Sequence, residues 1–233
     1  MIVVTADQKR STRHGDRVPE ALGALATDPP AGIRLPFERT VGDEIQGLLD
    51  SPAAVVWAVT RLVRIGGWRI GIGLGDVARP LPDTTRAATG SAFVAAREAV
   101  NASHSVPTDL RVLRAAVGAD GYGQDEPTRQ AESALWLLTA VLRRRTAEGW
   151  EIAEMAESGL SGREMAARLR ISPSAVSQRL ARACTQEAQR GAELAEALLA
   201  VAIQTTKAPT GDQPTRDGAT GGQPSRRHTG AGA

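Results

Sequence analysis

Residues 161–182 have the sequence SGREMAARLRISPSAVSQRLAR, which predicts two short helices joined by a tight turn. Ser161 is followed three residues later by Glu164, and this spacing is typical of a capping box at the start of a helix. Ser172 is expected to cap the second helix, with Pro173 at its first position, where a missing N–H costs nothing. The stretch therefore predicts a helix-turn-helix over residues 161–184.

The second helix has two faces of different character. Val176, Leu180 and Ala183 recur at helical spacing and are expected to be buried. The opposite face carries short hydrogen-bonding side chains, a methyl group and a guanidinium: Ser174, Ser177, Gln178, Ala181 and Arg182. Such a face suits a helix that lies against base edges in a major groove, so double-stranded DNA is the predicted partner.

Basic residues are concentrated in this stretch. Residues 161–182 hold five Arg and one Glu, whereas residues 1–142 hold 15 Lys and Arg against 16 Asp and Glu. Contacts to DNA phosphates require such a local excess of positive charge. The predicted DNA-binding residues are Ser172, Ser174, Ser177, Gln178 and Arg182 near the bases, with Arg163, Arg170 and Arg179 on phosphates.

Two alternatives to DNA binding stay open at this point. The stretch could be a plain helical hairpin, because nearly all the basic residues of the chain are Arg. It could also dock another protein without any catalysis. Arg170 departs from the common pattern, since it occupies the left-handed turn position where glycine is frequent.

Composition limits the class of protein. A chain of 233 residues has room for about two domains. Aromatic residues make up only 3% of the chain, so the core is expected to consist of Ala, Val, Leu and Ile. The single cysteine, Cys184, excludes an internal disulfide and a cysteine-based zinc site. No apolar run approaches the roughly 20 residues of a membrane helix, and a soluble cytoplasmic protein is expected.

The first half alternates strand-like and helix-like patterns. Strands are expected at 2–6 and 68–74, a β-hairpin at 33–40 and 44–49, and helices at 18–25, from 51 to about 65, and at 91–103, while residues 109–117 could be strand or helix. This order predicts an α+β sandwich, residues 1–120, with helices on one face of an antiparallel sheet.

The second half reads as helical throughout. An all-α domain is expected over residues 128–203, with helices at 129–146 and 148–158, the helix-turn-helix, and a long last helix. The apolar stripe of that last helix is expected to be Leu194, Ala197, Leu198 and Val201. Residues 204–233 contain almost no large apolar side chains and are predicted to be a disordered tail.

Two carboxylates of the first half form a candidate metal site. Asp7 follows the first strand, and Asp43 lies at the hairpin tip with Glu44 beside it. A neighbouring strand and hairpin would bring Asp7 and Asp43 to one sheet edge, where two oxygen ligands could hold Mg²⁺ together with a nucleotide. The alternatives are a turn residue for Asp43 and, for Asp7, an ion pair with Arg10 or Arg13.

These residues carry a family resemblance. Thr40-Val41-Gly42-Asp43-Glu44 resembles the hairpin of class III nucleotide cyclases and of GGDEF diguanylate cyclases, and Asp7 falls where those enzymes keep their first metal aspartate. Residues 69–75, RIGIGLG, resemble a later cyclase strand, and residues 92–97, AFVAAR, resemble the helix that bears the transition-state Asn and Arg. The resemblance implies a ferredoxin-like, nucleotide-cyclase-like sandwich that pairs into a homodimer.

The order of these motifs, followed by a helix-turn-helix, is similar to the bacterial SatD-like family over almost the whole chain. That resemblance implies a cyclase-related domain joined to a DNA-binding end.

The cyclase pattern is incomplete in two places. Phe93 stands where cyclases keep the Asn, and Arg39 stands where they keep a base-reading Lys. No catalytic residue is therefore assigned, and the candidate ligand-binding residues are Asp7, Arg39, Asp43, Glu44 and Arg97. The sequence favours a DNA-binding transcriptional regulator whose first domain senses a ligand, with a nucleotide as the candidate, or dimerises. A metal-dependent nucleotidyl cyclase-type enzyme is the alternative.

Overall fold

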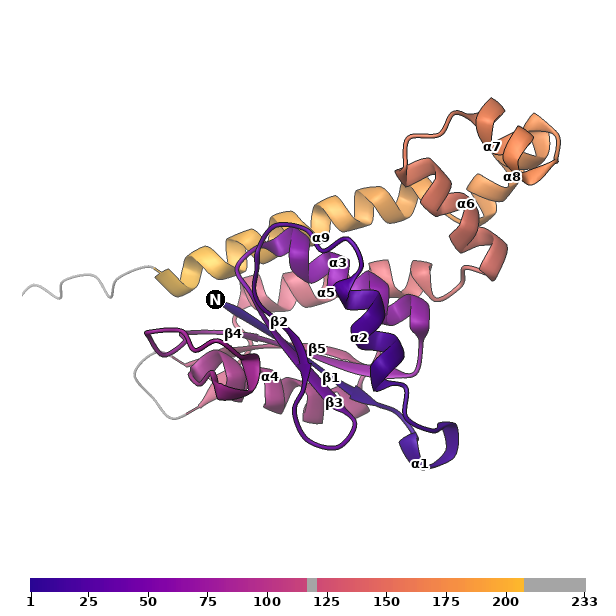
Figure 1. Cartoon of the computed structure of the whole chain (residues 1–233). Helices are drawn as coiled ribbons and strands as arrows, with labels where there is room; N and C mark the ends of the chain where they lie inside the picture. The colour runs from indigo at the N-terminus through magenta and orange to yellow at the C-terminus, as the bar shows by residue number, and fades with distance from the viewer. Residues whose placement is uncertain (117–120, 208–233) are drawn as a thin grey trace, which may run out of the picture.

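The chain forms a six-stranded mixed sheet with helices packed on it (Figure 1). The computed structural model describes residues 1–116 and 121–207. The strands lie in the order β2-β3-β1-β4-β5-β6, with bounds β1 Ile2–Gln8, β2 Ile33–Arg39, β3 Glu44–Leu49, β4 Trp68–Leu74, β5 Leu110–Ala115 and β6 Tyr122–Gly123. The predicted mixture of helix and sheet is confirmed.

The direction of one strand pair differs from the expectation. β1 is antiparallel to both β3 and β4, and β2 is antiparallel to β3, but β4 and β5 are parallel. The expectation of a wholly antiparallel sheet was therefore wrong. Neighbouring parallel strands need a crossover connection, and α4, Ser91–Ala102, provides it between β4 and β5. The ambiguous segment 109–117 contains strand β5.

Helices cover both faces of the sheet, and the expectation that they lie on one face was wrong as well. On one face the alternate residues Ile2 and Val4 share a core with α2 (Val18–Ala26), α3 (Pro52–Ile65), α5 (Glu126–Leu142) and α9 (Thr185–Lys207). On the other face Val3 packs against Phe93 of α4. Side chains alternate between the faces of a strand, so nearly continuous apolar strands such as β1 require a cover on each side.

Two glycines of β4 allow α4 to lie close to the sheet. A Cβ atom at Gly71 would lie 2.3 Å from the Ala96 carbonyl oxygen, and one at Gly73 would lie 2.2 Å from the Ala92 carbonyl oxygen. The alternating Ile-Gly-Ile-Gly sequence of β4 thus has a packing reason: isoleucines fill one core and glycines admit the α4 backbone on the opposite face.

The helical half is divided between two cores. Helices α5 and α9 pack in the same core as the sheet, so the expected boundary between residues 120 and 128 does not separate two cores. A second cluster is formed by α6 (Ala147–Glu157), α7 (Gly162–Leu169) and α8 (Pro173–Arg182), which project together from one end of the molecule (Figure 1). This three-helix group, here called the α6–α8 unit, joins the rest of the chain at residues 143–146 and 183–184.

The last helix buries a different stripe from the expected one. Of the expected stripe, Leu198 is partly buried and packs against the core, but Ala197 is exposed and Leu194 and Val201 are about half exposed. The buried residues of α9 are Ala188, Ala195, Leu199 and Ala202. Gly191 lies against Leu138 of α5, and small side chains on this face allow the two helices to pack closely. The prediction was wrong because apolar size was counted rather than closeness of packing.

The last helix also ends later than predicted. The helix continues to Lys207, so the first residues of the expected tail are helical, and residues 208–233 lie outside the described residues. None of the helices described combines the length and the apolar character needed to cross a bilayer.

Candidate nucleic-acid interface

The start of α7 has the predicted capping box. The Ser161 hydroxyl accepts a hydrogen bond from the Glu164 backbone N–H at 3.4 Å, and the Ser161 N–H donates to Glu164 Oε2 at 2.7 Å. Hydrogen bonds from the Ser161 hydroxyl and backbone N–H lower the pKa of Glu164. Ser172 caps α8 as expected, since its hydroxyl accepts from the Ala175 N–H at 3.2 Å.

Three residues connect the two helices. Arg170 has φ 54° and ψ 44°, which is the left-handed conformation expected at this position although glycine is more usual there. The N–H of Ile171 donates to the Ala166 carbonyl at 3.1 Å and closes the turn. The Arg170 side chain is exposed.

The two predicted faces of α8 are confirmed. Val176 and Ala183 are buried, and Leu180 is partly buried. They pack against Met165 of α7 and Ile152 of α6. The opposite face is exposed at every predicted position: Ser174, Ser177, Gln178, Ala181 and Arg182.

Some exposed polar side chains of α8 already make hydrogen bonds within the protein, and others do not. The Ser172 hydroxyl is used by the cap and lies 3.0 Å from the Ser174 hydroxyl, and the Ser177 hydroxyl donates to the Pro173 carbonyl at 3.2 Å. Within the described part of the chain, the side chains of Gln178 and Arg182 make no hydrogen bond. These two side chains therefore have the most unused hydrogen-bonding capacity on this face.

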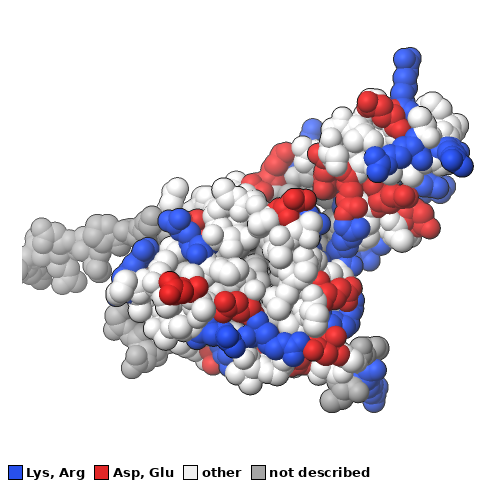
Figure 2. All heavy atoms as spheres, in the orientation of Figure 1, with Lys and Arg blue, Asp and Glu red and all other residues white. Residues whose placement is uncertain are grey.

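Arginines of α7 and α8 differ from those around the sheet in their partners. Among the described residues, Arg163, Arg168, Arg170, Arg179 and Arg182 form no ion pair with a carboxylate. Around the sheet, Arg17, Arg39, Arg69, Arg97 and Arg114 are paired, whereas the exposed Arg10 and Arg79 also lack an ion pair among the described residues. Figure 2 shows Lys and Arg side chains gathered at the α7–α8 end, with Asp and Glu between this end and the sheet. The positive charge of the pair is thus left for an external anion.

One residue of this surface was missed by the sequence analysis. A cavity of about 360 Å³ between the start of α6 and the end of α8 is lined by three arginines, Arg144, Arg179 and Arg182. Glu148 lies at the same cavity, and its pKa is lowered, first by a hydrogen bond from Thr146 and also by the charge of Arg179. The run Arg143-Arg144-Arg145 was the signal that could have indicated this extension of the basic surface.

The carboxylates of the predicted metal site lie at one end of the sheet, but in different pairs from those expected. The register places Glu44, not Asp43, directly opposite Asp7. Asp43 lies in the adjoining turn, where its carbonyl accepts from the Gln8 N–H at 3.3 Å. The structure thus brings the three carboxylates to the same sheet end, with Asp7 and Glu44 as the neighbours.

Arginines already neutralise two of these carboxylates. Asp7 Oδ2 lies 3.0 Å from Arg69 Nη1, so the expected partners Arg10 and Arg13 were wrong. Glu44 Oε1 lies 2.8 Å from Arg97 Nη2, and thus Arg97 holds a carboxylate of the chain itself.

The two departures from the cyclase pattern have structural roles elsewhere. Phe93 is 9% exposed and packs in the core between α4 and the sheet. Arg39 Nη2 donates to Asp16 Oδ1 at 2.7 Å, and this hydrogen bond lowers the pKa of Asp16. No group of three or more His, Cys, Asp or Glu side chains suited to a metal ion occurs among the described residues. The sheet end is therefore a network of ion pairs, and the α7–α8 surface is the stronger candidate site.

Comparison of the chain with protein-family models, curated proteins and solved structures finds no match in any of the three.

Proposed function

We propose that the protein is a DNA-binding transcriptional regulator in which α7 and α8 form a helix-turn-helix and α8 is the recognition helix. The observation that carries the proposal is the set of unpaired, mostly exposed arginines around an α8 face whose apolar side is buried. Arg163, Arg168 and Arg170 would contact phosphates, whereas Gln178 and Arg182 would reach base edges in the major groove.

The position of α8 supports this role. The α6–α8 unit projects from the end of the molecule, so a duplex could approach α8 without meeting the sheet (Figure 1). The helix pair is fixed by its own core, by both serine caps and by the left-handed turn at Arg170. A recognition helix held in this way can present side chains to DNA with little loss of conformational freedom on binding.

The sheet supports a sensory or dimerising role for the rest of the chain. Its first four strands have the order β2-β3-β1-β4, all antiparallel, with α2 and α3 as the crossovers, which is the arrangement expected for a ferredoxin-like, cyclase-related fold. The ion pairs Asp7–Arg69 and Glu44–Arg97 favour a non-catalytic version of that fold.

We further propose that the regulator works as a homodimer. Three large apolar side chains of the neighbouring helices α5 and α9 are exposed, namely Leu137 at 68%, Leu194 at 51% and Val201 at 49%. A twofold dimer would place two recognition helices on half-sites about 34–36 Å apart. Light scattering of the full chain at micromolar concentration tests this, and a monomer with and without DNA would contradict it.

Base reading by α8 is tested by one variant and its matched control. Gln178→Ala removes a side chain with unused hydrogen-bonding capacity, and Gln130→Ala removes an exposed glutamine from α5. Selection of binding sites from a random duplex library should give a motif for the wild type and for Gln130→Ala, with weaker preference at one position for Gln178→Ala. Identical motifs for all three proteins would show that Gln178 does not read a base.

A further inference from the structure

A cavity of about 340 Å³ lies where the α6–α8 unit meets the sheet. Its walls come from the end of β1, the end of α3, the start of β4, the end of α5 and the first turn of α6. The size falls in the range of small-molecule sites in proteins. The cavity is separate from both candidate sites described above.

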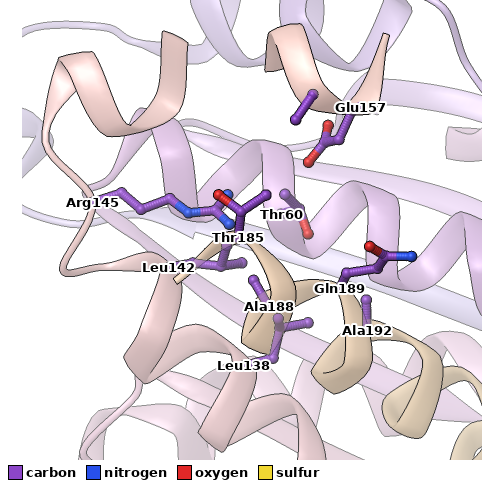
Figure 3. Close-up of a pocket in the computed structure, with 10 residues that line it drawn as sticks. Thr60, Leu138, Leu142, Arg145, Glu157, Thr185, Ala188, Gln189 and Ala192 are labelled. Carbon is purple, nitrogen blue, oxygen red and sulfur yellow. The ribbon is translucent and has the colours of Figure 1, made fainter. Parts of the chain in front are cut away.

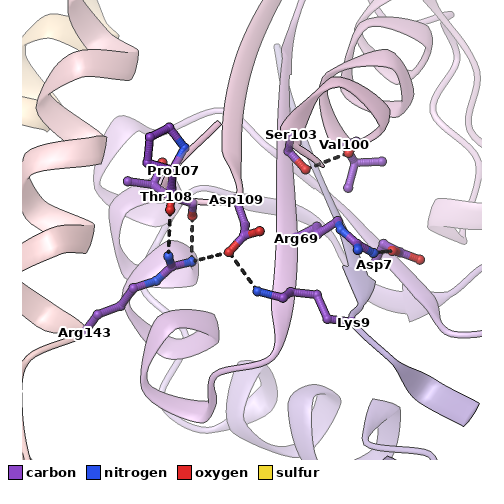
Figure 4. Close-up of polar contacts among 9 residues, drawn as sticks. All are labelled: Asp7, Lys9, Arg69, Val100, Ser103, Pro107, Thr108, Asp109 and Arg143. Atoms are coloured by element: carbon purple, nitrogen blue, oxygen red, sulfur yellow. Dashed lines mark hydrogen bonds and ion pairs between the residues drawn. The ribbon is translucent and has the colours of Figure 1, made fainter. Parts of the chain in front are cut away.

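The charge of the lining is of one sign. Four basic side chains, Lys9, Arg64, Arg143 and Arg145, line the cavity, and no carboxylate is among its lining residues. Three of these cations are paired with two carboxylates that do not line the cavity. Lys9 Nζ lies 2.9 Å and Arg143 Nη2 lies 3.1 Å from Asp109 Oδ2 (Figure 4), and Arg64 pairs with Glu154. One Asp therefore serves both Lys9 and Arg143, and Arg145 has no ion pair among the described residues. The charge of Glu157, which lines an adjoining cavity, also acts on Arg145, so the balance around the cavity is one positive charge in excess.

One residue that lines the cavity, Trp68, has a buried donor without a partner among the described residues. Trp68 is 3% exposed, and its indole nitrogen has no hydrogen-bond partner among the described residues. Buried polar groups are normally hydrogen-bonded, and an unpaired one costs stability unless a ligand or water satisfies it. An indole N–H can only donate, so its missing partner is an acceptor.

A neighbouring cavity differs from this one in the charge of its lining residues. A space of about 450 Å³ between α3, α5, α6 and α9 also includes Arg145, but there Glu157 contributes a carboxylate and the remaining walls are largely apolar (Figure 3). An anion would meet repulsion from Glu157 in that space. The cationic cavity beside Trp68 is the one suited to an anion.

Arg145 connects the cationic cavity to the recognition helix. Its Nε donates to the carbonyl of Ala183, the residue that ends α8, at 2.8 Å. Its guanidinium lies over the ring of Trp150 in α6, 4.8 Å from the ring centroid. Burial lowers the pKa of this guanidinium, so its charge is poorly solvated as the protein stands. Among the described residues, the hydrogen bond to Ala183 is the only one that joins the Arg145 side chain to the end of α8. An anion that binds Arg145 would therefore compete with this hydrogen bond or reorient it.

We infer that this cavity binds a small phosphate-bearing anion and that binding there changes the affinity of α8 for DNA. Three guanidinium groups and one ammonium group line the cavity and can donate hydrogen bonds to an anion with several oxygens. The inference rests on the proposed function for its regulatory part only, because anion binding can be measured without DNA.

The binding site is tested by titrating inorganic pyrophosphate and AMP into the full chain and measuring the heat released. Lys9→Gln and Arg145→Gln should each weaken binding at least tenfold. Arg61→Gln removes a charge from α3 outside this cavity and should leave binding unchanged. Thermal unfolding checks that each variant is folded, and Lys9→Gln, at a partly exposed position, keeps the test valid if Arg145→Gln unfolds. Equal affinity of all four proteins, or no heat with either probe at millimolar concentration, would overturn the site.

The regulatory part is tested by reciprocity. If the anion changes DNA affinity by some factor, DNA must change anion affinity by the same factor, and typical couplings are about 5- to 150-fold. We expect both titrations to give the same factor, and we expect it to vanish in Arg145→Gln. DNA affinity that does not respond to saturating anion would overturn the coupling. Loss of DNA affinity in Lys9→Gln without any anion would instead assign the cavity to DNA phosphates. If the chain binds no DNA, the calorimetric test of the cavity still stands.

Discussion

The arginines of α7 and α8 predict a measurable salt dependence of DNA binding. Arg163, Arg168, Arg170, Arg179 and Arg182 carry five charges without a carboxylate partner among the described residues. Each phosphate contact contributes about −0.9 to the slope of the logarithm of the binding constant against the logarithm of the salt concentration. Arg182 is assigned to a base edge, so the other four can contact phosphates, and the slope is then about −3.6 for one protomer. Raising the salt from 50 to 200 mM would weaken binding about 150-fold.

Removing one of these charges should change the slope by a defined amount. Arg170→Gln deletes the exposed charge in the turn and should make the slope shallower by about 0.9, so the same salt step costs about 40-fold. Arg86→Gln is the matched control, because the Arg86 side chain is 65% exposed but pairs with Glu38 of β2, outside the α6–α8 unit. The slope is obtained from fluorescence anisotropy of a labelled duplex at several salt concentrations.

The comparison of the two variants decides the matter. If Arg170→Gln and Arg86→Gln keep the wild-type slope alike, Arg170 does not contact a phosphate and the docking of the helix pair is wrong. If both variants make the slope shallower by the same amount, binding is a general effect of net charge, and no particular surface is involved.

Three further predictions concern the fold and the sheet end. Gly73→Ala should lower the free energy of unfolding by about 3 kcal/mol or more, because the new Cβ meets the α4 backbone. The control Gly23→Ala lies in α2, where the new Cβ meets no atom within 4 Å, and should raise the free energy of unfolding by about 0.5–1 kcal/mol. Denaturant unfolding that shows equal effects for the two variants would contradict the packing argument. Ser161→Ala should cost about 1 kcal/mol at neutral pH. The lowered pKa of Glu164 means that the cap stabilises the protein above the ordinary value of 4.5 and loses this contribution as the pH falls through the lowered value, so thermal unfolding from pH 7 to 3 should bring wild type and variant closer together. Millimolar Mg²⁺ should leave the melting temperature unchanged, because Asp7 is already neutralised; a rise that Asp7→Asn abolishes would restore the metal site.

Local signals in the sequence predicted the helix pair well. Caps at Ser161 and Ser172, the turn at Arg170 and the buried positions of α8 depend on neighbours within a few residues, and all were confirmed. The hairpin of β2 and β3 was predicted for the same reason. The exposed arginines follow directly, since a charged side chain outside the apolar stripe of a helix is expected to face water.

Features that depend on distant contacts could not be predicted in this way. Whether β5 lies parallel to β4 depends on where α4 crosses, and neither strand contains that information. The stripe of α9 was misjudged because Gly191 and small alanines pack against α5, while Leu194 faces outward. The partner of Asp7 is 62 residues away at Arg69, and no spacing rule connects them. The cationic cavity likewise collects side chains from five separate segments.

The central claim is that α8 reads DNA. The most direct measurement is fluorescence anisotropy of the full chain on the duplex upstream of its own gene and on a scrambled duplex of equal length, each over a range of salt. We expect tighter binding to the native duplex, an advantage that Gln178→Ala reduces, and affinities that fall steeply with salt on both duplexes. Absence of binding at low salt, or equal binding to both duplexes with no effect of Gln178→Ala, would contradict it.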